Sequence, residues 1–142
     1  MVNLKGNRLE RISEYAFAGL EETLTELELT ENKLRSFPTA ALRRLEQLRA
    51  LHLAWNEIST VQDDGHSRLD SLTLLDLSSN NLHALAAHNF RSMPSLRSLS
   101  LYHNGIETVH PDSFALLPQL ESLDLSHNKV SYHVTATNEL DA

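Results

Sequence analysis

An asparagine recurs at one fixed interval along most of the chain. Asn32, Asn56, Asn80, Asn104 and Asn128 follow one another at steps of 24 residues. A period of this size is typical of proteins built from stacked structural repeats, in which each repeat contacts only its neighbours. The spacing therefore predicts a repeat architecture before any single residue is interpreted.

The residues around each asparagine repeat as well. Aligned on the asparagines, the chain reads LTELELTENKL, LRALHLAWNEI, LTLLDLSSNNL, LRSLSLYHNGI and LESLDLSHNKV, which share the pattern LxxLxLxxNxL. An earlier partial copy, VNLKGNRL, places Asn7 at 25 residues before Asn32, because the linker between Leu20 and Leu24 carries one extra residue. We therefore predict a single domain over residues 1–142. Its six copies are a partial first copy over 1–23, then 24–47, 48–71, 72–95 and 96–119, and a degenerate copy over 120–142.

Each copy is expected to begin with a short β-strand. In an LxL segment the two leucines point to one side of the strand and the residue between them points to the other. A strand this short cannot bury its apolar side alone, so the copies must stack in parallel and share one core. The expected inward pairs are Leu27/Leu29, Leu51/Leu53, Leu75/Leu77, Leu99/Leu101 and Leu123/Leu125.

The rest of each copy is expected to close the coil. Apolar residues stand there at fixed offsets: Ile12, Phe37, Val61, Leu85 and Val109, then Leu20, Leu45, Leu69, Met93 and Leu117. Ten residues after the asparagines come Phe17, Leu42, His66, Phe90 and Phe114, so one copy is irregular. His66 either tolerates a half-exposed position or marks a looser loop adapted for contact. The repeated asparagine is polar yet expected to be buried, which requires hydrogen bonds from its amide to the backbone of neighbouring turns.

The pattern LxxLxLxxNxLxxLxxxxFxxLxx, from Val2 to Tyr132, resembles the "typical" leucine-rich repeat class of extracellular proteins such as Slit, the Toll receptors and chaoptin. The resemblance implies an α/β-type repeat solenoid, a right-handed arc with a short parallel strand per repeat on its concave face and irregular or 3-10 segments on its convex face. It also implies a secreted or cell-surface origin and protein recognition through the concave sheet. The chain departs from the class in having no cysteine-rich caps and no Asn-x-Ser/Thr sequon, so no residue independently requires the secretory pathway.

The ends of the repeat array lack the polar caps that seal a solenoid core. Met1 and Val2 start within a strand, and Asn138 stands where Phe or Leu is expected. We expect either an internal piece of a longer ectodomain or a small protein whose ends associate. Bare edge strands around Val2 to Leu4 or Leu120 to Leu125 are candidates for edge-to-edge self-association.

Composition and charge exclude several kinds of function. The formal net charge is −7, and the 12 Lys and Arg residues are scattered, which argues against a nucleic-acid partner. There is no cysteine, and no apolar stretch approaches the roughly 20 residues of a membrane span. Ser126, His127, Asp124 and His103 gather in the last copies but fill solvent-facing columns without a pocket. We therefore expect no catalytic residue, no cofactor and no metal site.

The concave sheet is expected to present the residues that alternate with the leucines and the two that precede each asparagine. The candidate partner-binding residues in these columns are Glu26, Glu28, Glu31, His52, Trp55, Asp76, Tyr102, His103, Asp124 and His127. Trp55, the only tryptophan, is either an interface anchor or a surface ring that folds onto its neighbours. Tyr102 and His103 lie two copies away, roughly 10 Å across the sheet, and would extend the same patch.

The first copies carry an acidic end, formed by Glu26, Glu28 and Glu31. It would suit a basic partner, or it is simply a solvated face. His52 is expected between Glu28 and Asp76 on adjacent strands, where two carboxylates favour the protonated imidazole.

The function expected from these features is protein recognition or cell adhesion, by a fragment of a receptor-type or secreted protein whose protein partner the sequence does not identify. A cytosolic leucine-rich repeat scaffold is the alternative, because cysteine and sequons are absent. A structural spacer whose faces bind nothing in particular is the third.

Overall fold

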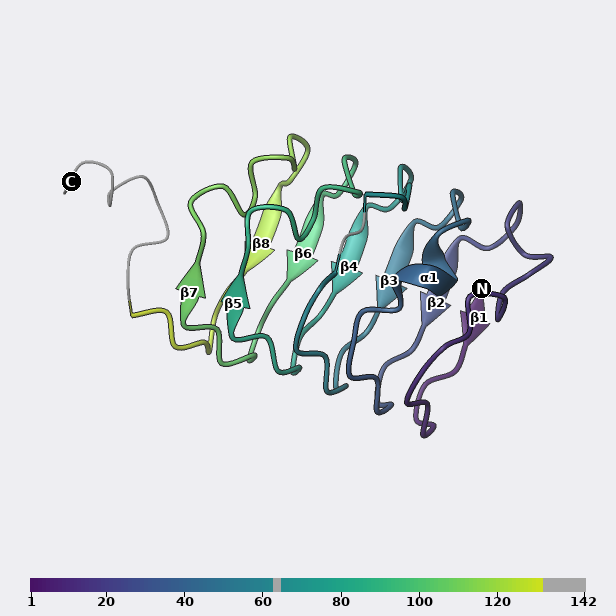
Figure 1. Ribbon diagram of the computed structural model, residues 1–142, viewed down its shortest axis with the longest axis horizontal. Coiled ribbons are helices and arrows are strands. Elements are labelled where there is room, and N and C mark those ends of the chain that lie inside the picture. Colours follow the sequence, from purple (N-terminus) through teal and green to yellow (C-terminus); the bar gives the residue numbers. More distant parts are fainter. Residues whose placement is uncertain (63–64, 132–142) are drawn as a thin grey trace.

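One strand from each copy joins a single parallel sheet. The computed structural model describes residues 1–62 and 65–131 (Figure 1). Within that part of the chain the strands β1, β2, β3, β4, β6 and β8 lie side by side in this order. Their bounds are Val2–Asn3, Glu26–Glu28, Ala50–His52, Leu74–Asp76, Ser98–Ser100 and Ser122–Asp124. The predicted parallel-strand solenoid is thus confirmed, while the predictions for Asp63, Asp64 and the tail with Asn138 lie outside the described residues.

The register of the sheet follows the repeat length. Leu27 pairs with Leu51, and the same 24-residue step then leads to Leu75, Leu99 and Leu123. At the first step Val2 pairs with Leu27, which is one residue more. The extra residue is absorbed in the linker, where the N–H groups of Thr23 and Leu24 both donate to the carbonyl of Leu20, at 3.1 and 2.9 Å.

The inward leucines of the middle strands form the core. The pairs of β2, β3, β4 and β6, from Leu27 to Leu101, are at most 1% exposed. The prediction for the last pair is wrong in part, because Leu123 is 38% exposed and Leu125 is half-buried. β8 is an edge of the sheet, as β1 is, and no described strand stacks beyond it. Self-association through these edges remains a prediction.

The convex side holds more regular structure than expected. Two short strands, β5 (Ala84–Leu85) and β7 (Thr108–Val109), form a second parallel sheet. In an earlier repeat a short helix, α1 (Thr39–Leu42), begins two residues after Phe37, which is the equivalent of Leu85 (Figure 1). Phe90 is buried and stacks on the half-buried Phe114, with ring centroids 6.1 Å apart. His66, the irregular residue of this series, is exposed.

The repeated asparagines connect neighbouring coils through their side-chain amides. The Nδ2 group of Asn56 donates to the carbonyls of Leu53 and Leu29, at 3.1 and 3.0 Å, and its Oδ1 accepts from the N–H of Leu34 at 3.0 Å. Asn32, Asn80, Asn104 and Asn128 repeat this arrangement. Each amide therefore satisfies backbone groups of its own coil and of the preceding coil. The predicted asparagine ladder is confirmed.

Replacing Asn80 with alanine should lower the free energy of unfolding by about 3 kcal/mol, because buried backbone groups lose their partners. The affected groups are the carbonyls of Leu53 and Leu77 and the N–H of Ile58. Urea unfolding measures the effect. The matched control is Asn81→Ala, at the exposed adjacent asparagine, which should cost about 0.5 kcal/mol or less. Equal losses in the two variants would contradict the ladder's role.

Candidate functional site

The residue before each ladder asparagine has a left-handed backbone. We call this series the turn column: Gly6, Glu31, Trp55, Ser79, His103 and His127, with φ between 55° and 73°. A positive φ is uncommon for residues other than glycine, is adopted most readily by Asn, Asp and His, and makes a bulky residue an outlier. Trp55 is therefore unexpected at this position. Its side chain is also 61% exposed, so burial does not compensate for the backbone conformation.

Four rings gather along the turn column and the position just before it. The Trp55 and His103 centroids are 6.5 Å apart in an edge-on arrangement, although one repeat lies between them. That intervening repeat carries only the small Ser79, so the two rings meet across it. Tyr102 lies 5.9 Å from His103 and 5.1 Å from His127, centroid to centroid. We call these four residues the ring cluster; the structure brings Trp55, Tyr102 and His103 together as the sequence predicted.

The acidic end is engaged in contacts within the chain. Glu26 contacts His52, with 3.1 Å between Oε1 and Nε2, and Glu31 lies 3.7 Å from the ammonium of Lys5. The Glu28 carboxylate accepts the N–H of Thr30 at 2.8 Å. The three carboxylates of the acidic end are therefore less available to a basic partner than the sequence indicated.

The expected contacts of His52 need correction. The sheet register places His52 level with Glu28 and Asp76, as predicted. However, both carboxylates bind N–H groups of their own turns, that of Asp76 accepting from Ser78 at 2.9 Å. The partner of the imidazole is instead Glu26, on the neighbouring strand two residues before Glu28.

Asp124 shows how such a turn holds its carboxylate. Its Oδ1 accepts hydrogen bonds from both the hydroxyl and the N–H of Ser126. The Ser126 hydroxyl lowers the pKa of Asp124 most, followed by the Ser126 N–H. Desolvation opposes them, and the charge of His127 lowers the pKa least. The Asp124 carboxylate is thus hydrogen-bonded within the turn that follows its own strand.

The Ser, His and Asp side chains of the turn column and the neighbouring strand ends are not arranged as a catalytic triad. The Ser126 hydroxyl is bonded to Asp124 rather than to an imidazole. Ser79 Oγ lies 3.4 Å from His103 Nδ1, which is longer than a nucleophile–base hydrogen bond of about 2.6–3.2 Å. Across residues 1–62 and 65–131 there is no group of three His, Asp or Glu side chains placed to hold a metal ion. Among the same residues no helix has the length and apolar character to cross a bilayer.

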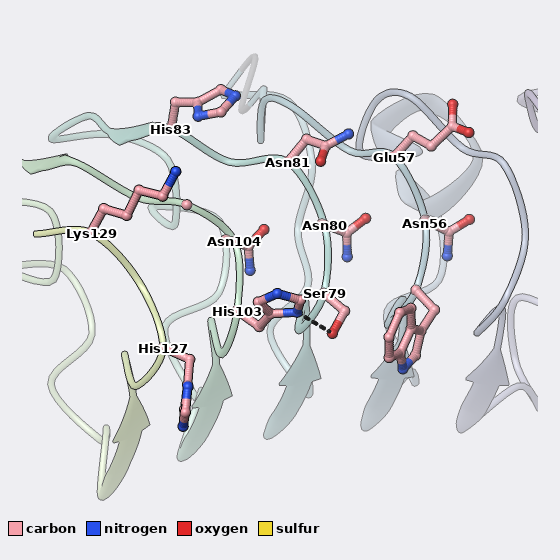
Figure 2. Close-up of a pocket in the computed structure, with 12 residues that line it drawn as sticks. Asn56, Glu57, Ser79, Asn80, Asn81, His83, His103, Asn104, His127 and Lys129 are labelled. Atoms are coloured by element: carbon pink, nitrogen blue, oxygen red, sulfur yellow. Dashed lines mark hydrogen bonds between the residues drawn. The ribbon is translucent and has the colours of Figure 1, made fainter.

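A groove of about 500 Å³ runs beside the turn column (Figure 2). Its first wall is formed by Trp55, Ser79, His103 and His127, its floor by Asn56, Asn80 and Asn104, and its second wall by Glu57, Asn81, His83 and Lys129. Figure 2 shows the three floor asparagines between Glu57, Asn81 and His83 on one side and Ser79 and His103 on the other. The sequence prediction, directed at the concave sheet, missed the second wall, although three of its residues directly follow ladder asparagines.

Comparisons with known proteins agree with this architecture. A family model described as Leucine rich repeat matches residues 1–58, 22–82 and 70–130. Chaoptin of Drosophila melanogaster is 43% identical over 54 residues, which are 38% of this chain and 4% of chaoptin. A leucine-rich repeat protein of Leptospira interrogans superposes with a TM-score of 0.76 at 31% identity, covering 91% of this chain and 31% of that one. The leucine-rich repeat domain of APL1B gives 0.76 at 28% identity, covering 90% and 38%. This chain thus spans well under half of each.

Replacing Trp55 with asparagine should raise the free energy of unfolding by about 0.5–1 kcal/mol. A left-handed residue with a bulky side chain costs roughly 1–2 kcal/mol, asparagine tolerates that conformation, and the lost ring contact with His103 offsets part of the gain. Urea unfolding again provides the measurement. Trp55→Ala is the control, because it removes the ring but keeps a left-handed residue with a Cβ, and it should bring no gain. A destabilised Trp55→Asn variant would show that the backbone is not strained.

Asp124 should titrate below the ordinary pKa of an aspartate, and Ser126→Ala should raise that pKa by removing its largest cause. Because the pKa is lower in the folded chain than in the unfolded chain, this contribution stabilises the fold above the unfolded value. It is lost as the pH falls through the folded pKa. An NMR titration of the carboxyl carbon tests both statements. An unchanged pKa in Ser126→Ala would contradict the assigned cause.

Proposed function

Because this chain belongs to the leucine-rich repeat family, whose domains generally bind other proteins, we propose that it is a protein-recognition module with the ring cluster at the centre of its binding surface. The observation that carries the proposal is the exposed Trp55 on a left-handed backbone. A bulky residue in that conformation costs stability, and such strain concentrates at functional sites. We infer that the exposed Trp55 ring binds a partner, and that this function explains the strained backbone.

The chemistry of the ring cluster suits a protein interface. Tryptophan and tyrosine are enriched among the residues that dominate interface energetics, because a large ring buries much apolar area with little loss of side-chain freedom. Trp55 and Tyr102 are both exposed, at 61% and 38%, and His103 contacts both rings. A partner that covers the cluster therefore gains a contiguous aromatic contact. The concave residues His52 and Asp76 contact Glu26 and Ser78 instead, so we do not place them at the centre of this surface.

The origin we propose for the module is a secreted or receptor-type protein with a recognition or adhesion role. The match to chaoptin supports it, since chaoptin is one of the extracellular proteins that the repeat pattern resembles. A protein partner is favoured over a nucleic acid because the chain has a net charge of −7. The role is binding rather than catalysis, in keeping with the Ser126 hydroxyl being bonded to Asp124.

A panel of secreted and cell-surface ectodomains, screened against the folded module, tests the proposal. A partner that binds the wild type should bind Trp55→Asn and Tyr102→Ala at least tenfold more weakly, which corresponds to about 1.4 kcal/mol. Tyr15→Ala is the control, because Tyr15 is 64% exposed in the first copy and lies outside the ring cluster. A partner that binds all three variants like the wild type would place the interface elsewhere. A module that binds no member of the panel would favour the spacer function.

A further inference from the structure

The groove beside the turn column changes in chemical character along its length. Toward β3 it is lined by Trp55 and Glu57, whereas toward β8 it is lined by His83, His103, His127 and Lys129. Figure 2 shows His83 and Lys129 on one side of this half and His103 and His127 on the other. Histidine is the side chain whose charge changes between pH 5 and pH 8. This half of the groove therefore combines three imidazoles with the permanent charge of Lys129.

Few negative charges face these histidines. Within the lining, Glu57 is the acidic residue, and it lies 3.5 Å from the guanidinium of Arg35. Glu107 lies in the next coil, where its N–H donates to the carbonyl of His83 at 2.8 Å. The side chain of Glu107 is exposed and is not part of the lining. Asp124, whose pKa Ser126 lowers, attracts His127 from outside the lining. Among the described residues, the lining of this half thus holds three imidazoles and the Lys129 ammonium and no carboxylate.

The floor and one gap in the second wall determine what the groove can recognise. The amides of Asn56, Asn80 and Asn104 are used by the ladder, so the floor offers a ligand no free amide. Gly105 takes the place that Glu57, Asn81 and Lys129 hold in other copies. A Cβ there would lie 3.7 Å from His83 Nδ1, so the absent side chain leaves an opening beside this imidazole. Recognition must therefore come from the rings and cations of the walls.

We propose that this groove binds an extended acidic segment of a partner protein, and that the binding strengthens as the pH falls from 7.5 to 5.5. The segment's carboxylates lie toward His83, His103, His127 and Lys129, and its backbone crosses the exposed face of Trp55. At neutral pH the net charge of −7 repels such a segment, and protonation of the three histidines supplies the local complementarity that overcomes this repulsion. The inference rests on the proposed function, because it names the partner chemistry for that same surface.

The fluorescence of Trp55 measures the binding directly, because it is the only tryptophan and lies in the groove wall. The probe is a capped octapeptide of glutamate, titrated into the whole chain separately at pH 5.5 and at pH 7.5. The dissociation constant should be at least tenfold lower at pH 5.5, where glutamate side chains stay largely ionised. An octapeptide of glutamine should not bind at either pH, and an octapeptide of lysine should not bind more tightly at pH 5.5 than at pH 7.5.

Variants assign the effect to the groove. His83→Gln and Lys129→Gln, at two exposed positions, should each weaken octaglutamate binding at pH 5.5 severalfold, and His83→Gln should also reduce the pH dependence. His103→Asn should reduce it further while tolerating the left-handed backbone. The control is His88→Gln, which removes an exposed histidine outside the groove and should bind like the wild type.

Three results would overturn the inference: equal affinity at the two pH values, unchanged binding in the groove variants, or a dodecamer of deoxythymidine that binds as tightly as octaglutamate. The last would indicate a general anion site rather than a peptide groove. A separate result would contradict the proposed function: partners that bind Trp55→Asn as tightly as the wild type at pH 7.5. A partner that needs Trp55 but shows no pH dependence would leave the function standing and remove the acidic-segment inference.

Discussion

The hydrogen bonds of the asparagine ladder hold successive coils of the solenoid together. Each side-chain amide joins backbone groups of two successive coils, as Asn56 does with Leu29, Leu34 and Leu53. A buried amide tolerates little displacement, because any unpaired group costs about 1–3 kcal/mol. The ladder therefore sets where each strand ends and how the chain turns. The left-handed residue before each asparagine and the floor of the groove both follow from that turn.

The turn column presents one surface position per coil at regular intervals along the solenoid. Its residues project at the same edge in every coil, so a change at one position leaves the core leucines untouched. This separation lets Trp55 and His103 differ from Gly6 without disturbing the sheet. The cost is local, since a large ring on a left-handed backbone strains only its own turn. The turn column is thus the part of the fold where residues that form a binding surface lower the stability least.

The sequence predicted those parts of the molecule that the repeat itself determines. The period and the LxL segments predicted the parallel sheet, its register, the buried leucines of the middle coils and the ladder, because all of these follow from pattern and burial. The partner of His52 could not be predicted, because alternation places Glu28 and Asp76 beside it but does not reveal that their turns already bind both carboxylates. The second wall of the groove was missed because the order of residues along the strand says little about the turn beyond it. Gly6, His103 and His127, whose residue types favour a positive φ, were the available signals of the left-handed column.

We propose that partners bind at the turn-column edge and the groove. Amide hydrogen exchange of the module, free and saturated with a captured partner, locates the binding surface. Slowed exchange on binding should be concentrated at Trp55, Ser79 and residues 102–105. Protection concentrated instead on the convex side, at α1 and β5, with the turn column unchanged, would contradict it.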